Sequence, residues 1–138
     1  MIGYITIGAD DMEAAERFYS AFLPALGYEF SASRAGLSYA LPAPADRPQE
    51  TADLYVVPPF DGRVATAGNG AMLAFSLPTQ ALVRDLHAAA VAAGGRDDGA
   101  PGFRAAYGPH FYVGYLRDPQ GNKVALYCDS RTEPRRPD

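Results

Sequence analysis

The sequence is poor in the residues that build disulfides and metal sites. Among its 138 residues there is one cysteine, Cys128, and there are two histidines, His87 and His110. A single cysteine excludes an internal disulfide and a cysteine-based metal cage. Because a mononuclear metal enzyme usually supplies two or more histidines beside carboxylates, the composition also disfavours that class of site.

Long apolar runs and concentrated positive charge are absent as well. No apolar stretch approaches the roughly 18 residues of a bilayer-spanning helix, and no basic region followed by an apolar stretch begins the sequence. Twelve basic and sixteen acidic residues give a net charge of −4, and the basic residues cluster only at Arg135 and Arg136. Phosphate binding needs a concentrated positive face. We therefore expect a cytoplasmic protein with neither a nucleic-acid nor a membrane partner.

What remains is the composition of an ordinary globular domain. Hydrophobic residues make up 48% and charged residues 20% of the chain, which argues against disorder. The length fits one domain, or two small halves that share a core. Apolar patterning predicts strands at 2–7, 28–33, 37–41, 54–57, 71–76, 111–116 and 122–128.

Two helices are predicted, each with a start and a stop signal. Asp10 or Asp11 can cap the first helix, which is expected to run to Gly27 with its last turn distorted by Pro24. Thr79 begins the second, and the glycine pair at 94–95 ends it.

The segment after the second helix, 96–102, is rich in glycine and aspartate, and no strand is predicted there. The last two strands are joined at 118–122, where proline and glycine predict a tight hairpin turn. We assign Asp118 and Asn122 to the geometry of this turn rather than to catalysis. The polar, proline-rich tail 130–138 is expected to fray.

The second half of the chain repeats the element order of the first. Strand, helix and glycine stop coincide at an offset of 68 positions, and the last strands coincide at a slightly longer one. We therefore predict an α+β fold of two tandem βαβββ modules, with module boundaries at 1–59 and 70–129, a linker at 60–69 and a flexible tail at 130–138. The aligned pairs include Tyr4 with Met72, Phe18 with Leu86, Gly27 with Gly95, and Tyr55 with Ala125.

Three motifs follow one another along nearly the whole chain. The first is YITIG at 4–8, followed by AAERFY at 14–19 and LGY at 26–28; the second is GNGAMLAF at 68–75; the third is YGPHFY at 107–112, running into RDPQGN at 117–122. Together they resemble the vicinal oxygen chelate superfamily of glyoxalase I, bleomycin-resistance proteins and extradiol dioxygenases. The resemblance implies a curled, cup-shaped mixed sheet around a small-molecule site, with helices on its outer face, usually in a homodimer.

The same resemblance implies where a metal would be bound. Metal-binding members carry His, Glu or Gln at four strand positions, two in each module. These positions correspond here to Tyr4, Met72, Ala125 and, through the repeat, Tyr55. None of the four is a usual ligand of a divalent metal. The expectation is therefore the fold without a divalent cofactor.

Strand alternation sorts the side chains onto two faces. One set is aliphatic and suits a face covered by helices. The other is aromatic, sulfur-bearing and weakly polar, and suits a planar or amphipathic ligand; the alternative is a second packed core. The first set is Ile5, Ile7, Leu54, Val56, Leu73, Phe75, Val124 and Leu126, and the second is Tyr4, Thr6, Tyr55, Val57, Met72, Ala74, Ala125 and Tyr127.

A few further residues are candidates at the rim of the expected cup. His110 can serve as a general base or ligand donor, since its charge can change near neutral pH, or as a loop histidine with a structural bond. Arg104 can meet an anionic ligand group or stay solvated. Tyr39 and Tyr112 complete the rim candidates.

Two other residues are expected to be structural. The second helix places His87 on the flank of its apolar stripe, which predicts a position on the helix surface. Cys128 belongs to the helix-facing set and is expected to be a buried apolar residue rather than a nucleophile.

Two classes of function stay open. The first is a binding or sequestering protein for a small organic molecule, with Tyr4, Tyr55, Met72 and Ala125 on the floor of an aromatic-lined, metal-free cup. The second is an enzyme, a lyase or isomerase rather than a dioxygenase, that acts through His110 and tyrosines or through a non-standard metal site.

Overall fold

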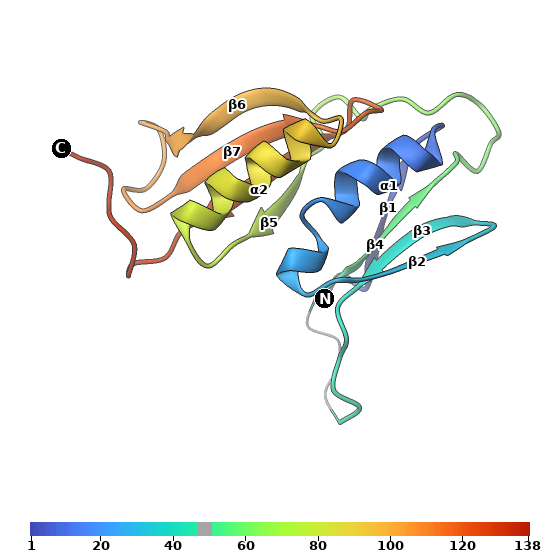
Figure 1. The fold of residues 1–138 in the computed structure, drawn as a ribbon, viewed down its shortest axis with the longest axis horizontal. Helices are drawn as coiled ribbons and strands as arrows, with labels where there is room; N and C mark the ends of the chain where they lie inside the picture. Colours follow the sequence, from blue (N-terminus) through green and yellow to red (C-terminus); the bar gives the residue numbers. More distant parts are fainter. Residues whose placement is uncertain (47–50) are drawn as a thin grey trace.

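Two modules with the same element order make up the structure, a computed structural model that describes residues 1–46 and 51–138 (Figure 1). The α+β class with two βαβββ modules is thereby confirmed. The first module holds β1 (Tyr4–Gly8), α1 (Met12–Ser20), the 3₁₀ helix η1 (Pro24–Leu26), β2 (Glu29–Ser33), β3 (Gly36–Ala40) and β4 (Asp53–Val57). The second holds β5 (Leu73–Ser76), α2 (Gln80–Ala92), β6 (Arg96–Phe103), β7 (Tyr112–Arg117) and β8 (Lys123–Cys128).

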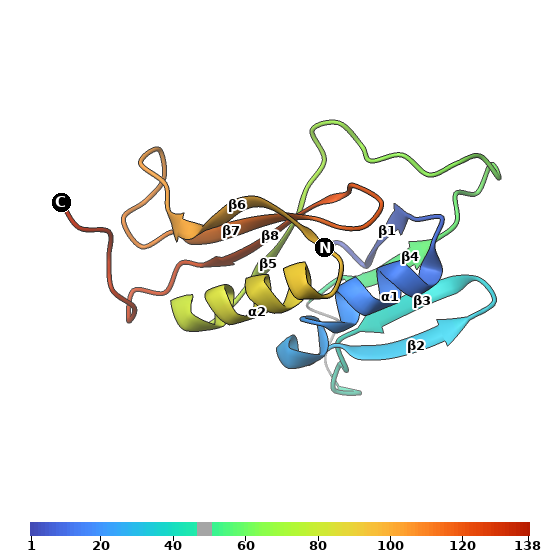
Figure 2. The ribbon, with the colours of Figure 1, turned by 45° about the horizontal axis from the view of Figure 1, so that its top comes forward.

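Each module builds one four-stranded sheet, in the orders β1-β4-β3-β2 and β5-β8-β7-β6. The β1–β4 and β5–β8 pairs are parallel and the other pairs are antiparallel. A parallel pair needs a long crossover connection, and in each module the helix lies within that connection. The helices lie next to each other on one side of the two sheets (Figures 1 and 2). None of the helices in the described part of the chain has the length and apolarity needed to cross a bilayer.

The predicted helix starts are confirmed, but the first helix ends early. The Asp11 carboxylate caps α1 by accepting the N–H of Ala14, and the Thr79 hydroxyl caps α2 in the same way. α1 stops at Ser20 instead of continuing toward Gly27, and Pro24 opens the separate η1. Proline has no N–H for the helical ladder, and its ring clashes with the carbonyl four residues earlier.

The aliphatic set of strand residues faces the helices, as alternation predicted. All of its members belong to the core or pack against it. Cys128 is fully buried and free, also as expected. Aromatic rings join the two modules within this core: Phe75 of β5 meets Phe22 with ring centres 5.6 Å apart and Tyr28 at 6.2 Å.

The structure contains a strand that the sequence did not predict. β6 pairs with β7, but its register shifts between Asp97 and Gly99 and again between Gly99 and Gly102. Gly99 has a φ of +151°, which L side chains rarely adopt. These irregularities break the two-residue alternation by which strands are recognised, and glycine within a strand often marks such bulges.

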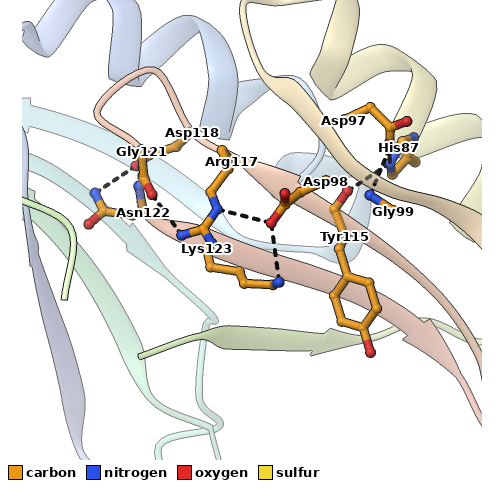
Figure 3. A network of polar contacts seen from close by, with 10 residues as sticks. All are labelled: His87, Asp97, Asp98, Gly99, Tyr115, Arg117, Asp118, Gly121, Asn122 and Lys123. Carbon is orange, nitrogen blue, oxygen red and sulfur yellow. Dashed lines mark hydrogen bonds and ion pairs between the residues drawn. The ribbon is translucent and has the colours of Figure 1, made fainter. Parts of the chain in front are cut away.

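His87 is inside the molecule and not on the helix surface, so that prediction is wrong. The side chain is nearly buried between α2 and the second sheet, with Nε2 3.0 Å from the Tyr115 backbone oxygen and 3.3 Å from an Asp97 carboxylate oxygen (Figure 3). Gly114 on β7 makes the room, because a Cβ there would lie 2.8 Å from His87 Cδ2. A glycine on a distant strand thus decides where a helical residue points.

The turn between β7 and β8 is built around the buried Asp118 carboxylate. Its Oδ1 accepts the N–H groups of Gln120 and Asn122 at 2.9 and 2.8 Å. Its Oδ2 accepts the Tyr19 hydroxyl of α1 at 2.7 Å and the Asn122 amide at 2.9 Å. The assignment of Asp118 and Asn122 to turn geometry agrees with these bonds, and the bond to Tyr19 connects the turn to the first module.

The same turn also reaches β1 and the linker. The Asn122 amide donates to the Gly8 carbonyl at 3.0 Å, and the Gln120 amide donates to the Ala65 carbonyl at 2.9 Å. Asp10 closes this network, because its N–H donates to the Gln120 side chain while its carboxylate accepts the Ala65 N–H. A single hairpin turn thereby fixes the second module to the start of the first.

The tail is held at two places, although the sequence predicts that it frays. The backbone N–H of Gln80, at the start of α2, donates to the Glu133 carboxylate, and its side chain donates to the Pro134 carbonyl. The Arg136 guanidinium donates to the carbonyls of Arg104 and Tyr107 in the loop after β6. Its contacts therefore support the loop that lies between β6 and β7.

Gly114→Ala is expected to lower the free energy of unfolding by about 1–3 kcal/mol, because the added methyl overlaps the His87 ring. Gly108→Ala is the matched control, since nothing lies within 4 Å of a Cβ at Gly108. Its effect should stay within about 0.5 kcal/mol. Urea unfolding of both variants measures the difference, and equal stabilities would contradict the packing of His87 against Gly114.

Tyr19→Phe is expected to lower the free energy of unfolding by about 1–3 kcal/mol, because Asp118 keeps its buried charge with one donor fewer. Tyr28→Phe, which also removes a hydroxyl from a ring at the module junction, should change it by less than about 0.5 kcal/mol. Denaturant unfolding gives both values. A Tyr19→Phe variant as stable as the parent would show that the bond to Asp118 does not hold the modules.

The pH dependence of stability under alkaline conditions tests the hydrogen bond between Tyr19 and Asp118. Burial, and then the Asp118 charge, raise the pKa of Tyr19 well above its ordinary value of 10.0. The neutral phenol therefore contributes stability that is present below 10.0 and is lost as the pH rises from there toward the raised value. Between about pH 9 and about pH 11, the Tyr19→Phe variant should lose less stability than the parent.

Candidate ligand site

The face of each sheet that carries no helix, here called the open face, holds the second set of strand side chains. Cross-strand registers place the members of this set in rows, which confirms the predicted alternation. One row runs through Thr6, Tyr55 and Ser38 on the first sheet. The corresponding row on the second sheet runs through Ala74, Ala125 and Tyr115.

The four positions predicted for the floor of the cup have different surroundings. Tyr4 and Tyr55 lie together on the first sheet, with ring centres 5.8 Å apart and an edge-on arrangement, and Tyr4 is 68% exposed. Met72 is half-exposed and lies at a hollow of the second sheet. Ala125 is 1% exposed, so it offers almost no surface to a ligand.

An aromatic hollow of about 480 Å³ lies on the open face of the second sheet. Phe111 is central to it: its ring meets Tyr107 edge-on at 5.3 Å and stacks on Tyr127 at 5.2 Å. Tyr107, Phe111 and Tyr115 were not predicted as site residues, although the aromatic density of 107–112 was the available signal for Tyr107 and Phe111. The lining residues are Met72, Ala106, Tyr107, Gly108, Phe111, Tyr115 and Asp129.

Two cations flank the Tyr115 ring. The Arg104 guanidinium carbon lies 5.4 Å from the ring centre on the β6 side, and the Lys123 ammonium lies 4.9 Å from it on the β8 side. Burial, and then the neighbouring Tyr107, raise the pKa of the Tyr115 phenol, whereas Arg104 lowers it. The hydroxyl is therefore neutral near pH 7, and its hydrogen-bond partner is Tyr107.

The irregular strand β6 creates the place for Arg104. The Arg104 guanidinium folds back along β6 and donates to the carbonyls of Ala100 at 2.8 Å and Phe103 at 3.3 Å. A Cβ on Gly99 would lie 2.9 Å from the Tyr115 ring and 3.3 Å from Arg104 Nη2. Gly99 makes β6 hard to recognise in the sequence, and it also leaves the room in which Arg104 and the Tyr115 ring meet. Arg104 does not line the hollow itself, but its guanidinium lies over the ring of Tyr115, which does.

Lys123 is part of an ion-pair group on the same face. The Asp98 carboxylate is 2.9 Å from Arg117 Nε and 3.1 Å from Lys123 Nζ, and Arg117 also donates to the Gly121 carbonyl (Figure 3). The hydrogen bond from Lys123, and then that from Arg117, lower the pKa of Asp98. Figure 3 shows the Tyr115 ring on the opposite side of β7 from His87 and α2.

A solved structure identifies the family. The chain is 32% identical to a glyoxalase/bleomycin resistance protein from Albidiferax ferrireducens T118, with a TM-score of 0.75, over 93% of this chain and 98% of that one. This chain belongs to the glyoxalase/bleomycin resistance protein family. The resemblance to the vicinal oxygen chelate superfamily is thereby confirmed.

More distant glyoxalase structures share the fold. A glyoxalase-related enzyme from Fulvimarina pelagi is 23% identical with a TM-score of 0.68, over 93% of this chain and 87% of that one. A lactoylglutathione lyase from Agrobacterium tumefaciens is 20% identical with a TM-score of 0.61, over 93% of this chain and 92% of that one. No protein-family model and no curated protein match the chain.

Tyr39, expected at the rim, is in the core of this family member. Its side chain is fully buried, and its hydroxyl shares a 2.9 Å hydrogen bond with Ser20 at the end of α1. Burial raises the pKa of Tyr39. Tyr39 pairs with Leu54 in the row that faces the helices, so alternation along β3 turns it away from the open face.

Tyr112 is likewise turned toward a helix and away from the rim. It is 8% exposed, and its hydroxyl accepts a hydrogen bond from Arg84 of α2 at 3.4 Å. Its partner across β8 is the buried Cys128. Tyr112 occurs within the aromatic motif at 107–112, but it begins β7 with its side chain on the helix side of the sheet.

His110 lies beside the aromatic hollow rather than in it. It lines a neighbouring hollow of about 380 Å³ together with Pro109 and Arg131, and both hollows share Gly108 and Asp129. His110 Nδ1 is buried and has no hydrogen-bond partner within the described residues. A buried polar atom of this kind calls for an explanation, such as a bound group or a catalytic role.

The residues that the resemblance places at the metal positions do not fit a divalent metal. Two phenols, a thioether and a methyl group replace the imidazoles and carboxylates that such ions prefer. Within residues 1–46 and 51–138, no three His, Cys, Asp or Glu side chains come together in a group able to hold a metal. Tyr4, Tyr55, Met72 and Ala125 are therefore poor donors for a divalent ion.

Proposed function

We propose that this member of the glyoxalase/bleomycin resistance family binds a small organic molecule in the aromatic hollow. One observation carries the proposal: Tyr107, Phe111, Tyr115 and Met72 line a single hollow of about 480 Å³ on the open face. That volume lies in the range of small-molecule sites, which are largely apolar with a few placed polar groups. The aromatic rings suit contact with a planar ligand.

We also propose that this binding needs no divalent metal. The support is the set of side chains at the four family positions, where Tyr4, Tyr55, Met72 and Ala125 lack usual donors. A ligand would then be held by stacking, sulfur contacts and hydrogen bonds alone. The work of the site would be recognition and sequestration of that molecule.

His110 supports a second candidate, an enzyme of the lyase or isomerase type. Its Nδ1 is buried without a partner, and its hollow adjoins the aromatic one through Gly108 and Asp129. A ligand that extends from one hollow into the other could exchange a proton with this nitrogen. The fold shared with a lactoylglutathione lyase does not by itself carry that activity, because one fold hosts many functions.

A screen of aromatic metabolites and antibiotics by thermal shift, followed by calorimetry of the hits, tests the binding proposal. Tyr115→Ala should weaken binding at least about tenfold, because the ligand loses a stacking surface. Phe60→Ala, which removes a fully exposed ring outside the aromatic hollow, should change the affinity less than about twofold. Equal affinities of the two variants would place the ligand elsewhere.

Elemental analysis and a turnover assay separate metal-free binding from a metal site and from an enzyme. After incubation with Zn²⁺, Ni²⁺, Mn²⁺ or Fe²⁺, elemental analysis should find well below one bound ion per chain. Stoichiometric binding that is lost in Tyr4→Phe or Tyr55→Phe would contradict the metal-free proposal. Turnover of a hit that disappears in His110→Ala would favour the enzyme.

We further propose that the chain is a cytoplasmic homodimer. The support for dimerisation is the exposure of large apolar side chains outside the core, among them Phe60, Val64 and Tyr4. Surfaces of this kind often mark interaction sites. Light scattering should give twice the 14.7 kDa chain mass at micromolar concentration, and Phe60→Asp should shift it toward one chain. A parent protein at the single-chain mass would contradict the dimer.

A further inference from the structure

Positive charge gathers on the open face of the second sheet, although the chain as a whole carries −4. Arg104, Arg117 and Lys123 lie on this face around Tyr115. The carboxylates near them are Asp98, which is held between two of the cations, and Asp129 at the wall of the hollow. The cations therefore outnumber the carboxylates at this part of the site.

The three cations are not equivalent. Arg117 and Lys123 share the Asp98 carboxylate, which neutralises much of their charge. Arg104 has carbonyl partners only, and no carboxylate in the described part of the chain forms an ion pair with it. A guanidinium carries five N–H donors, so two carbonyl bonds leave donors free. Arg104 is thus the uncompensated cation beside the hollow.

The position of Arg104 is built by β6, the strand that precedes it. The glycines at 99 and 102 leave the open face of β6 clear, and the guanidinium occupies that space against the Tyr115 ring. The carbonyls of Ala100 and Phe103 fix its orientation. A ligand carboxylate at the Tyr115 end of the hollow would meet a pre-oriented guanidinium with free N–H donors, which forms charge-assisted hydrogen bonds with it.

We propose that the ligand of the aromatic hollow is a planar aromatic carboxylate, and that Arg104 is the residue that recognises its charge. This inference rests on the proposed function, because it names the chemical class that the same hollow takes. The ligand's aromatic ring lies against Phe111 and Tyr115, and the ligand's carboxylate accepts hydrogen bonds from Arg104. Asp129 opposes the binding of any anion in the hollow, so its negative charge limits the affinity.

Calorimetry with 2-naphthoate and its neutral isostere 2-naphthamide tests this selection. The parent protein should bind 2-naphthoate at least about tenfold more tightly than 2-naphthamide. Arg104→Gln should remove that preference by lowering the affinity for 2-naphthoate alone. Arg104→Lys should restore part of the preference. Asp129→Asn should strengthen 2-naphthoate binding severalfold and leave 2-naphthamide unchanged.

Arg84→Gln is the matched control, because it removes the same charge from α2 on the other side of the sheet. It should leave the affinities for both probes unchanged, and thermal melts should show that every variant is folded. Equal affinities for the two probes in the parent, or an equal loss of both in Arg104→Gln, would overturn the anion inference while binding in the hollow stands. If neither probe binds at millimolar concentration, the inference of an aromatic carboxylate is wrong, and the wider thermal-shift screen decides the proposed function separately.

Discussion

The Asp118 carboxylate is the point on which the arrangement of the two modules depends. It is buried, it accepts the N–H groups of its own turn, and it accepts the Tyr19 hydroxyl from the other module. Because the turn joins β7 to β8, the same bonds fix the strands that carry Tyr115 and Lys123. Leaving a buried carboxylate without its donors is costly, so this junction gives the open face a defined geometry.

Much of the fold could be predicted because its signals are local or repeated. Asp11 and Thr79 cap the helices by contacts within their own first turns, and alternation assigns strand residues to faces. The positions of His87 and β6 could not be predicted in this way. His87 points inward because Gly114, on a strand far along the chain, leaves room for its ring. β6 is irregular because its glycines serve a contact with Tyr115 rather than the strand pattern.

The candidate site, like the fold, combines features that could be predicted from the sequence with features that could not. The aromatic character of the open face could be predicted from residue types. The rim could not, because Tyr39 and Tyr112 follow the alternation of their own strands toward the helices. The charge around Tyr115 depends on which side chains meet across β6, β7 and β8. Only the register of the sheet reveals that Arg104 and Lys123 flank one ring.

In the proposal, the ligand is recognised by aromatic rings and by Arg104, which has no paired carboxylate among the residues that the structure describes. The most direct test is a crystal structure with bound 2-naphthoate. The account predicts that the naphthalene ring contacts Phe111 and Tyr115, with the carboxylate about 3 Å from the Arg104 guanidinium. A ligand seated on the first sheet between Val57 and Phe60, or a metal ion bound at Tyr4 and Tyr55, would contradict it.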